Sequence, residues 1–249
     1  MKTKELSNIN SFYLISDVHL SDPKDALTEK FISFLKSIPT NSDLFLLGDI
    51  WDILFVNKIY FQKLWKNVFD LFFQMKKNNV RIFFLEGNHD FGFENFPSSF
   101  LDDRFTFYGD CYFKIKNKNE TILMAHGDNI VCPKKYLTFR RLVKSWWLQK
   151  LITPFLLGFI CQLIFGFYAK VSRKSSYSKI IDPEFFQKCV HSFLKNFENN
   201  FPDYLIIGHI HQERKQYVNS KTLFISGKDW VSLPSFLKFE DGLITRIFL

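Results

Sequence analysis

The chain has 249 residues, of which 47% are hydrophobic and 18% aromatic, and its formal net charge is +8. A chain this long and this apolar can bury a substantial core, which excludes intrinsic disorder. The four cysteines (Cys111, Cys132, Cys161 and Cys189) form no C-x-x-C pair. They therefore indicate reduced structural thiols in a cytosolic setting rather than a disulfide framework or a zinc knuckle.

The first half of the chain alternates between buried strands and amphipathic helices. Its start is basic but lacks the long apolar stretch of a signal peptide, so we expect no export signal. Apolar runs at 12–15, 43–47 and 80–85 predict strands, and the apolar residues of 26–38 and 60–78 have helical spacing. Strands separated by helices favour a parallel sheet that is covered on both faces.

The second half is expected to hold shorter strands around a helical segment. Strands are predicted at 105–108, 111–116, 121–125, 204–207, 214–218, 222–226 and 243–248. The C-terminal strands are typical of an antiparallel meander, and the chain between about 134 and 200 is expected to be helical. We predict one domain over residues 1–249, an α/β sandwich with a helical insertion at about 130–180.

Five apolar runs end in the same kinds of polar residue. These strand ends read Asp17-Val18-His19, Gly48-Asp49-Ile50-Trp51-Asp52, Gly87-Asn88-His89-Asp90, His126-Gly127-Asp128 and His209-Ile210-His211. Ligands of open α/β sheets bind beyond the carboxyl ends of the strands, so this pattern gathers these side chains at one edge.

Each of these motifs alone has a plain structural reading, since "GNHD" suits a turn and "GDIWD" suits an Asp-capped helix start. Their joint occurrence is far more specific, because five of the six histidines lie in them. Carboxylate, imidazole and amide ligands without thiolate suit Mn²⁺, Fe²⁺, Zn²⁺ or Mg²⁺. Two such ions can clamp the oxygens of a phosphoryl displacement, and Asp49 at its Gly turn is the natural bridging carboxylate.

The ordered set D-x-H, G-D-x-x-D, G-N-H-D, H-G-D and G-H-x-H resembles the calcineurin-like metallophosphoesterases and spans residues 17–211. The resemblance implies a four-layer α/β/β/α sandwich with a dinuclear metal centre, most consistent with Mn²⁺. It implies a ligand set of Asp17, His19, Asp49, Asn88, His126, His209 and His211. Asp49, Asn88 and His89 would be the catalytic residues, with His89 contacting the scissile phosphate, helped by Asp90.

Residues 126–151 are similar to one branch of that family, the UDP-2,3-diacylglucosamine diphosphatases of lipid A biosynthesis. The similarity rests on Tyr136, Phe139-Arg140, Trp147-Leu148-Gln149 and the "RKSSYSK" run at 173–179. It implies substrate contacts from Asn88, His89, Tyr136, Arg140, Arg173, Ser175, Ser178 and Lys179. This chain differs from that branch at His89, where its members carry Arg, and at Pro133-Lys134, where they carry an acidic pair.

The expected insertion is basic and contains a long apolar stretch. Residues 129–181 hold ten Lys or Arg and no Asp or Glu, and residues 151–169 carry no charge. A single membrane span there would place His126 and His209 on opposite sides of the bilayer, so we expect a surface-lying apolar cap, a buried helix or a re-entrant pair. We favour the cap, with basic residues on anionic head groups and aromatic residues in the interface.

These features predict a hydrolase that cleaves UDP-2,3-diacylglucosamine to UMP and 2,3-diacylglucosamine 1-phosphate. The expected enzyme is a monomer at the cytoplasmic face of a bacterial inner membrane, without a nucleic-acid partner. The apolar stretch within the basic segment is unlike a phosphate-backbone groove. One alternative is a phosphoesterase for another lipid diphosphate or a nucleotide phosphodiester, and another is a membrane scaffold whose metals are only structural.

Overall fold

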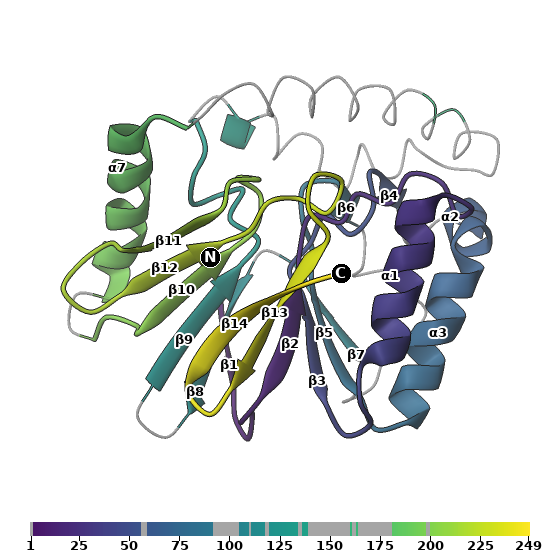
Figure 1. Ribbon diagram of the computed structural model, residues 1–249. Coiled ribbons are helices and arrows are strands. Elements are labelled where there is room, and N and C mark those ends of the chain that lie inside the picture. The colour runs from purple at the N-terminus through teal and green to yellow at the C-terminus, as the bar shows by residue number, and fades with distance from the viewer. Residues whose placement is uncertain are drawn as a thin grey trace.

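Two six-stranded sheets stacked face to face form the centre of the protein (Figure 1). The computed structural model describes residues 2–55, 59–91, 105–109, 111–117, 120–133, 136–138, 160, 163, 181–197 and 200–249. Helices pack on the outer face of each sheet, which confirms the four-layer α/β/β/α arrangement.

The first sheet contains the predicted parallel strands. Its spatial order is β14 (Leu243–Phe248), β13 (Ser235–Glu240), β2 (Phe12–Ile15), β3 (Asp43–Leu46), β5 (Arg81–Leu85) and β7 (Phe105–Tyr108). The pairs β2–β3, β3–β5 and β5–β7 are parallel, whereas β13 pairs antiparallel with both β2 and β14. Every residue of β3 is buried, as its uninterrupted apolar run predicted.

The second sheet differs from the expected antiparallel meander. Its order is β1 (Lys2–Leu6), β8 (Cys111–Asn117), β9 (Glu120–Ala125), β10 (Tyr204–Ile207), β12 (Leu223–Ser226) and β11 (Arg214–Tyr217). β10 pairs parallel with both β9 and β12, so the meander prediction was wrong for these strands. The cause is burial: apolar β12 takes the inner position, whereas the polar sequence of β11 suits the exposed edge.

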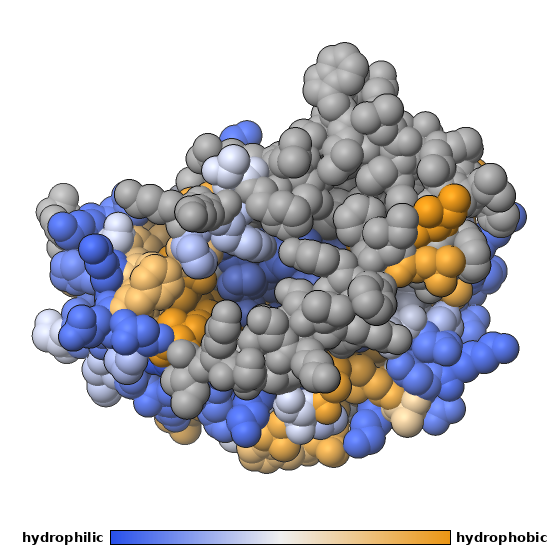
Figure 2. All heavy atoms as spheres, turned by 90° about the horizontal axis from the view of Figure 1, so that it is seen from above, coloured by the Kyte–Doolittle hydropathy of each residue, from blue (hydrophilic) through white to orange (hydrophobic). Residues whose placement is uncertain are grey.

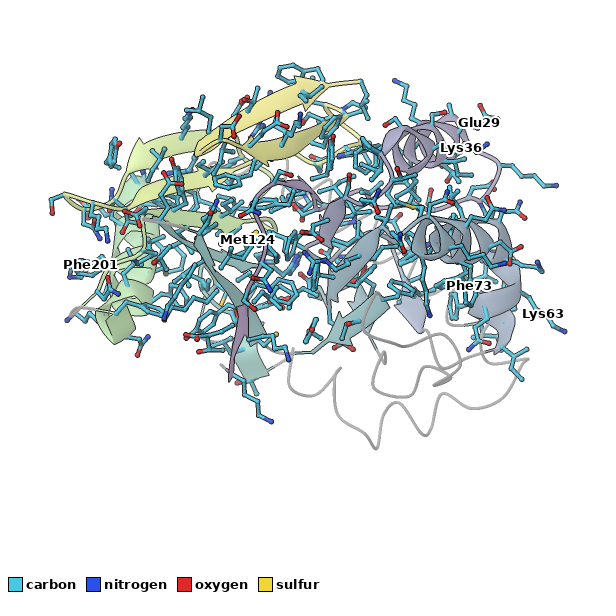
Figure 3. All side chains as sticks on the ribbon, turned by 90° about the horizontal axis from the view of Figure 1, so that it is seen from below. Glu29, Lys36, Lys63, Phe73, Met124 and Phe201 are labelled. Carbon is cyan, nitrogen blue, oxygen red and sulfur yellow. The ribbon has the colours of Figure 1, made fainter. Side chains whose placement is uncertain are left out.

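Three apolar clusters join the four layers. One lies between the first sheet and helices α1 (Ala26–Ser37) and α3 (Lys66–Lys77), and a second lies between the two sheets. The third joins the second sheet to α7 (Pro183–Leu194). Viewed from below, Glu29 and Lys36 lie on the outer side of α1, whereas Met124 lies at the centre between the sheets (Figure 3). Helices thus cover the outer face of each sheet and the other sheet covers the inner face, so the predicted parallel strands are covered on both faces, as expected.

The predicted helix at 60–78 is two helices. α2 (Ile59–Leu64) ends at Trp65, whose φ of −101° and ψ of 20° leave the helical region before α3 begins. The indole of Trp65 is buried against Trp51, with ring centroids 6.1 Å apart. Burying this large side chain stabilises the break, and the apolar spacing of the sequence continues across it unchanged.

Helix ends elsewhere follow the sequence closely. Asp25 caps α1 by accepting a hydrogen bond from Thr28 N at 2.7 Å, and Asp182 caps α7 by accepting one from Phe185 N at 2.8 Å. Pro183 occupies the first turn of α7, where no intrahelical donor is needed. A two-stranded ladder of β4 (Leu54–Phe55) and β6 (Asp90–Phe91) and a short 3₁₀ turn, η3 (Lys195–Phe197), complete the elements used below.

Most of the expected insertion lies outside the described residues, including Trp146, Trp147, Phe155, Phe159 and Phe165. The described portion consists of residues 130–133, the helical stretch 136–138 and the single helical positions Ile160 and Leu163. In the part of the chain that the structure describes, no helix has the length and hydropathy of a membrane span.

Candidate metal centre

The five predicted strand ends meet at one edge of the sandwich, the upper edge in Figure 1. Viewed onto this edge, hydrophilic residues lie at the bottom of a depression (Figure 2). Parallel pairing of β2 with β3, of β3 with β5, and of β9 with β10 brings their carboxyl ends to the same side. Sequence positions 192 residues apart thereby become neighbours, since His19 Nε2 lies 3.2 Å from His211 Nε2.

Three overlapping groups of ligand-type side chains occupy this edge. They are Asp17, His19 and His211; then His19, Asp49 and His89; and finally Asp49, His126 and His209. Within each group one ligand atom from every residue lies within 4.8 Å of the others. Asn88 adjoins the third group, with its Oδ1 3.1 Å from His126 Nε2. Asp49 belongs to two of the groups, with His19 and His89 in one and with His126 and His209 in the other.

Oxygen and nitrogen atoms with lone pairs face one another across these groups. His211 Nε2 lies 3.2 Å from Asp17 Oδ1, and His126 Nε2 lies 3.4 Å from Asp49 Oδ2. Close packing of acceptors from carboxylate and imidazole is unfavourable unless a proton or a cation lies between them.

The rear nitrogens of four imidazoles face oxygen atoms, and two of them are hydrogen-bonded. His126 Nδ1 lies 2.8 Å from Leu47 O, and His89 Nδ1 lies 2.8 Å from Asp52 O, so each Nδ1–H donates to a carbonyl. His19 Nδ1 lies 3.3 Å from Asp52 Oδ1. His211 Nδ1 faces the carboxylate of Asp229 at 4.0 Å. Metal-ligating histidines show this arrangement, in which the rear N–H is held and the front nitrogen is directed at the ion.

Five of the seven predicted ligands have left-handed backbone conformations. Their φ angles are 56° for Asp17, 58° for His19, 53° for Asp49, 63° for His209 and 51° for His211. Such a conformation costs a residue with a side chain on the order of 1–2 kcal/mol relative to a right-handed one. Asp and His adopt it more often than most residues, and its concentration in one cluster is typical of functional sites.

Two motif glycines are required by the close approach of the predicted ligands. A Cβ on Gly87 would lie 2.1 Å from Asp49 Oδ1, and a Cβ on Gly208 would lie 2.3 Å from Asp17 Oδ2. Those carboxylates occupy the space above the glycines because they accept backbone hydrogen bonds there: His89 N donates to Asp49 at 2.8 Å, and His209 N donates to Asp17 at 2.9 Å. The glycines of "GNHD" and "GHIH" are therefore steric requirements of the site.

The Asp90 side chain contacts the backbone of the loops that hold the predicted ligands. It is fully buried, and it accepts hydrogen bonds from Gly87 N at 2.8 Å, Asp49 N at 3.0 Å and Ile50 N at 2.7 Å. These contacts commit the carboxylate to the loop backbone, and its expected help to His89 in contacting phosphate stays a prediction. Asp90 fixes the position of Asp49.

The charges of the cluster shift its pKa values strongly. Burial disfavours the charged form of every group here, but the hydrogen bond and charge of His211 outweigh it and lower the pKa of Asp17 to about 2. His126 and His89 likewise hold the pKa of Asp49 well below its usual range against burial. Asp49 in turn raises the pKa of His126 to about 10, although burial lowers it.

His211 and His209 respond in opposite directions. Burial lowers the pKa of both, but the hydrogen bond and charge of Asp17 give His211 a net raised pKa. Burial and then the charge of His126 lower the pKa of His209 to about 4. At neutral pH without metal, a proton therefore resides on His126, which faces the carboxylate of Asp49.

The donor set fits divalent metal ions. Carboxylate, imidazole and amide oxygen ligands are held at strand ends, the rear nitrogen of His126 is hydrogen-bonded, and the proton of His126 occupies a position that a cation can take. All seven predicted ligands come together: Asp17, His19, Asp49, Asn88, His126, His209 and His211. These observations support divalent metal binding at this edge and leave the choice of ion open.

Only some of the predicted substrate contacts fall in the described part of the chain. The Tyr136 ring lies 5.9 Å from the His209 ring, which places it beside the cluster. His89 Nε2 lies 3.9 Å from Asp49 Oδ2, and its ring packs edge-on to that of His19. The other predicted contacts, which are Arg140, Arg173, Ser175, Ser178 and Lys179, lie outside the described residues.

Comparisons with known proteins agree with this geometry. The calcineurin-like phosphoesterase family matches residues 11–213. Relatives named UDP-2,3-diacylglucosamine hydrolase occur in Haemophilus influenzae (strain Rd; 28% identical, covering 92% of this chain and 95% of that protein) and Neisseria gonorrhoeae (29%, 88% and 89%). A third, from Wigglesworthia glossinidia brevipalpis, is 28% identical and covers 94% of this chain and 92% of its own.

Among solved structures, an archaeal phosphodiesterase is similar at 12% identity, over 96% of this chain and 99% of its own, with a TM-score of 0.45. The family match extends over most of the chain and includes all five strand-end motifs. The chain belongs to the calcineurin-like phosphoesterase family.

Proposed function

We propose that this protein is a dinuclear-metal hydrolase that cleaves the pyrophosphate bond of UDP-2,3-diacylglucosamine, giving UMP and 2,3-diacylglucosamine 1-phosphate. The observation that carries the reaction class is the position of Asp49, which belongs to two adjoining groups of ligand-type side chains. Support for the substrate comes from relatives that carry the hydrolase name and align over about nine-tenths of the chain.

The residues of the cluster divide into two sets of metal ligands. Asp17, His19, Asp49 and His211 would hold one ion, and Asp49, Asn88, His126 and His209 would hold the other. When bound, the ions supply charge stabilisation for the phosphate and activation of the attacking water. We propose Mn²⁺ as the ion, since the oxygen and nitrogen donors without thiolate suit it.

His89 is proposed as the residue that faces the scissile phosphate. Its Nδ1–H donates to Asp52 O at 2.8 Å, which fixes the ring and leaves Nε2 on the side of Asp49. From there it can stabilise negative charge that develops on phosphate oxygens. The leaving phosphate monoester needs little proton donation, so we assign His89 to charge stabilisation rather than to obligatory acid catalysis.

We also propose a peripheral, monomeric enzyme at the cytoplasmic face of the inner membrane. The substrate's acyl chains and the ten basic residues within 129–181 are the reasons. Ile160 and Leu163, the two described positions of the apolar region, are exposed at 39% and 59%, which suits contact with acyl chains or lipid. Flotation with anionic vesicles, compared with zwitterionic ones, tests this proposal.

The decisive test of the function is UMP release by the purified protein with Mn²⁺. UDP-2,3-diacylglucosamine is compared with UDP-N-acetylglucosamine, and Asp49→Ala serves as the inactive variant. Asp43→Asn is the matched control, because Asp43 is also a buried carboxylate but pairs with Arg81 at the start of β3. We expect turnover of the acylated substrate alone, by the wild type and Asp43→Asn. Activity only on a generic phosphodiester would retain the metal centre and reject the proposed substrate.

A further inference from the structure

A sixth strand end reaches the metal centre. β12 lies beside β10 in parallel, so the residues after it emerge at the same edge as His209 and His211. The segment after β12 is Gly227-Lys228-Asp229-Trp230, and it contains no histidine and resembles none of the five strand-end motifs.

Two contacts attach this loop to the predicted ligands. Trp230 N donates to Asp17 O at 2.9 Å, and Asp229 Oδ2 lies 4.0 Å from His211 Nδ1. The Trp230 ring is buried against Phe31 and Phe34, and its Nε1 donates to Ser235 O at 2.6 Å. The loop is thus anchored in the core on one side and faces the ligands on the other.

The Asp229 carboxylate is fully buried and held in one orientation. Ser232 donates to it twice, from its backbone N to Oδ1 at 3.0 Å and from its hydroxyl to Oδ2 at 3.1 Å. Burying a carboxylate is costly unless hydrogen bonds and opposite charge compensate. The N–H dipole at His211 Nδ1 can offer part of that compensation, because this side of the ring faces Asp229 Oδ2 at 4.0 Å.

His211 consequently lies between two carboxylates. Asp17 Oδ1 faces Nε2 at 3.2 Å, and Asp229 Oδ2 faces Nδ1 at 4.0 Å. His19 repeats the pattern, with Asp52 Oδ1 3.3 Å behind its Nδ1. A carboxylate behind an imidazole fixes the ring and keeps the proton on the rear nitrogen. The front nitrogen then donates its lone pair more strongly to a metal ion.

We propose that Asp229 is a positioning residue of the metal centre, which orients His211 so that its Nε2 faces the ion shared with Asp17 and His19. The inference rests on the proposed function, since it assumes that this cluster binds metal. The distance of 4.0 Å is longer than a hydrogen bond, so Asp229 acts through charge and orientation.

The test is Mn²⁺ binding by the full-length protein, followed as loss of the electron paramagnetic resonance signal of the free ion. Asp229→Asn keeps the size of the side chain and removes its charge, and Ser232→Ala removes one of the groups that hold it. We expect Asp229→Asn to weaken binding of one of the two ions by about tenfold or more, and Ser232→Ala to weaken it less. Asp43→Asn should bind as the wild type does.

Thermal unfolding of the metal-free variants separates positioning from simple stability. A lower melting temperature for Asp229→Asn with unchanged Mn²⁺ affinity would overturn the proposal. If Asp229→Asn does not fold, Ser232→Ala decides, and unchanged affinity in that variant overturns the proposal equally. If the wild type binds no Mn²⁺, the proposed function itself fails, a result distinct from these.

A His211→Ala background shows whether Asp229 acts through His211. In that background Asp229→Asn should cause no further loss of affinity, because the ring that it orients is absent. A further loss as large as in the wild type would show that Asp229 acts by another route and would overturn the assignment.

Discussion

The left-handed backbone of the predicted ligands leads to a quantitative prediction about stability. His19 and His126 are both buried, at 1% and 3% exposure, but only His19 has a positive φ, at 58°. Replacing each histidine by Ala and by Gly gives two pairs of variants. Within a pair, both variants lose the same imidazole contacts and differ only in one methyl group.

The magnitude follows from comparing the two pairs. At both positions Gly loses a buried methyl group and gains unfolded-state entropy, and both effects lower stability. At His19 alone, Gly also relieves a left-handed strain of roughly 1–2 kcal/mol. The unfolding free energy of the Gly variant minus that of the Ala variant should therefore be more positive at position 19 than at position 126, by about 1–2 kcal/mol.

Urea unfolding of the metal-free proteins measures this difference. With a slope on the order of 3 kcal/mol/M for a chain of this size, the effect corresponds to roughly 0.3–0.7 M in the midpoint. Excess chelator during unfolding removes any contribution from bound ions. Equal Gly-minus-Ala differences at the two positions would refute the claim that the ligand loops store backbone strain.

Three further predictions concern protons, loop structure and catalysis. Because the pKa of His126 is raised to about 10, metal binding at neutral pH must displace its proton, and Mn²⁺ affinity should rise with pH from 6 to 9. Calorimetry in buffers of different ionisation enthalpy should detect the released proton, and the release should be smaller in His126→Ala. Asp90→Asn places an amide donor against backbone N–H groups and should lower the unfolding free energy by about 1–3 kcal/mol in urea unfolding. An unchanged midpoint would contradict the assignment that Asp90 fixes the position of Asp49. His89→Ala should lower kcat by about 10²–10³-fold and leave Mn²⁺ affinity unchanged, whereas loss of metal binding would make His89 a ligand instead.

The sequence predicted those elements whose burial is continuous. β3, β5 and β10 are short apolar runs, and their side chains face the core from both sides of the sheet. β1 was missed, because "KTKEL" is polar and almost wholly exposed, and it is a strand only through pairing with β8. The strand propensity of a segment contains no information about a pairing partner that is distant in the sequence.

The residues of the candidate site that lie at strand ends were predicted, whereas those that support them from other loops were not. All seven predicted ligands cluster because each motif brings its own chemistry to a strand end, and the parallel pairing brings the ends together. The roles of Asp52 and Asp229 were not predicted, since each depends on the approach of a loop distant in sequence. For Asp229, the one signal in the sequence was an aspartate that directly precedes a tryptophan, Trp230, and this pattern fits an ordinary turn equally well.

The hydrogen bonds of the cluster connect its loops to one another without metal. Asp17 accepts from His209 N, and Asp49 accepts from His89 N, so each carboxylate also fastens the loop that supplies a later histidine. Asp90 closes the second of these links by holding Asp49 N. A ligand mutation should therefore disturb more than one metal contact, since removing a carboxylate releases a neighbouring loop as well. In urea unfolding of the metal-free protein, Asp17→Ala should therefore lower stability more than Asp17→Asn, which retains an acceptor for His209 N.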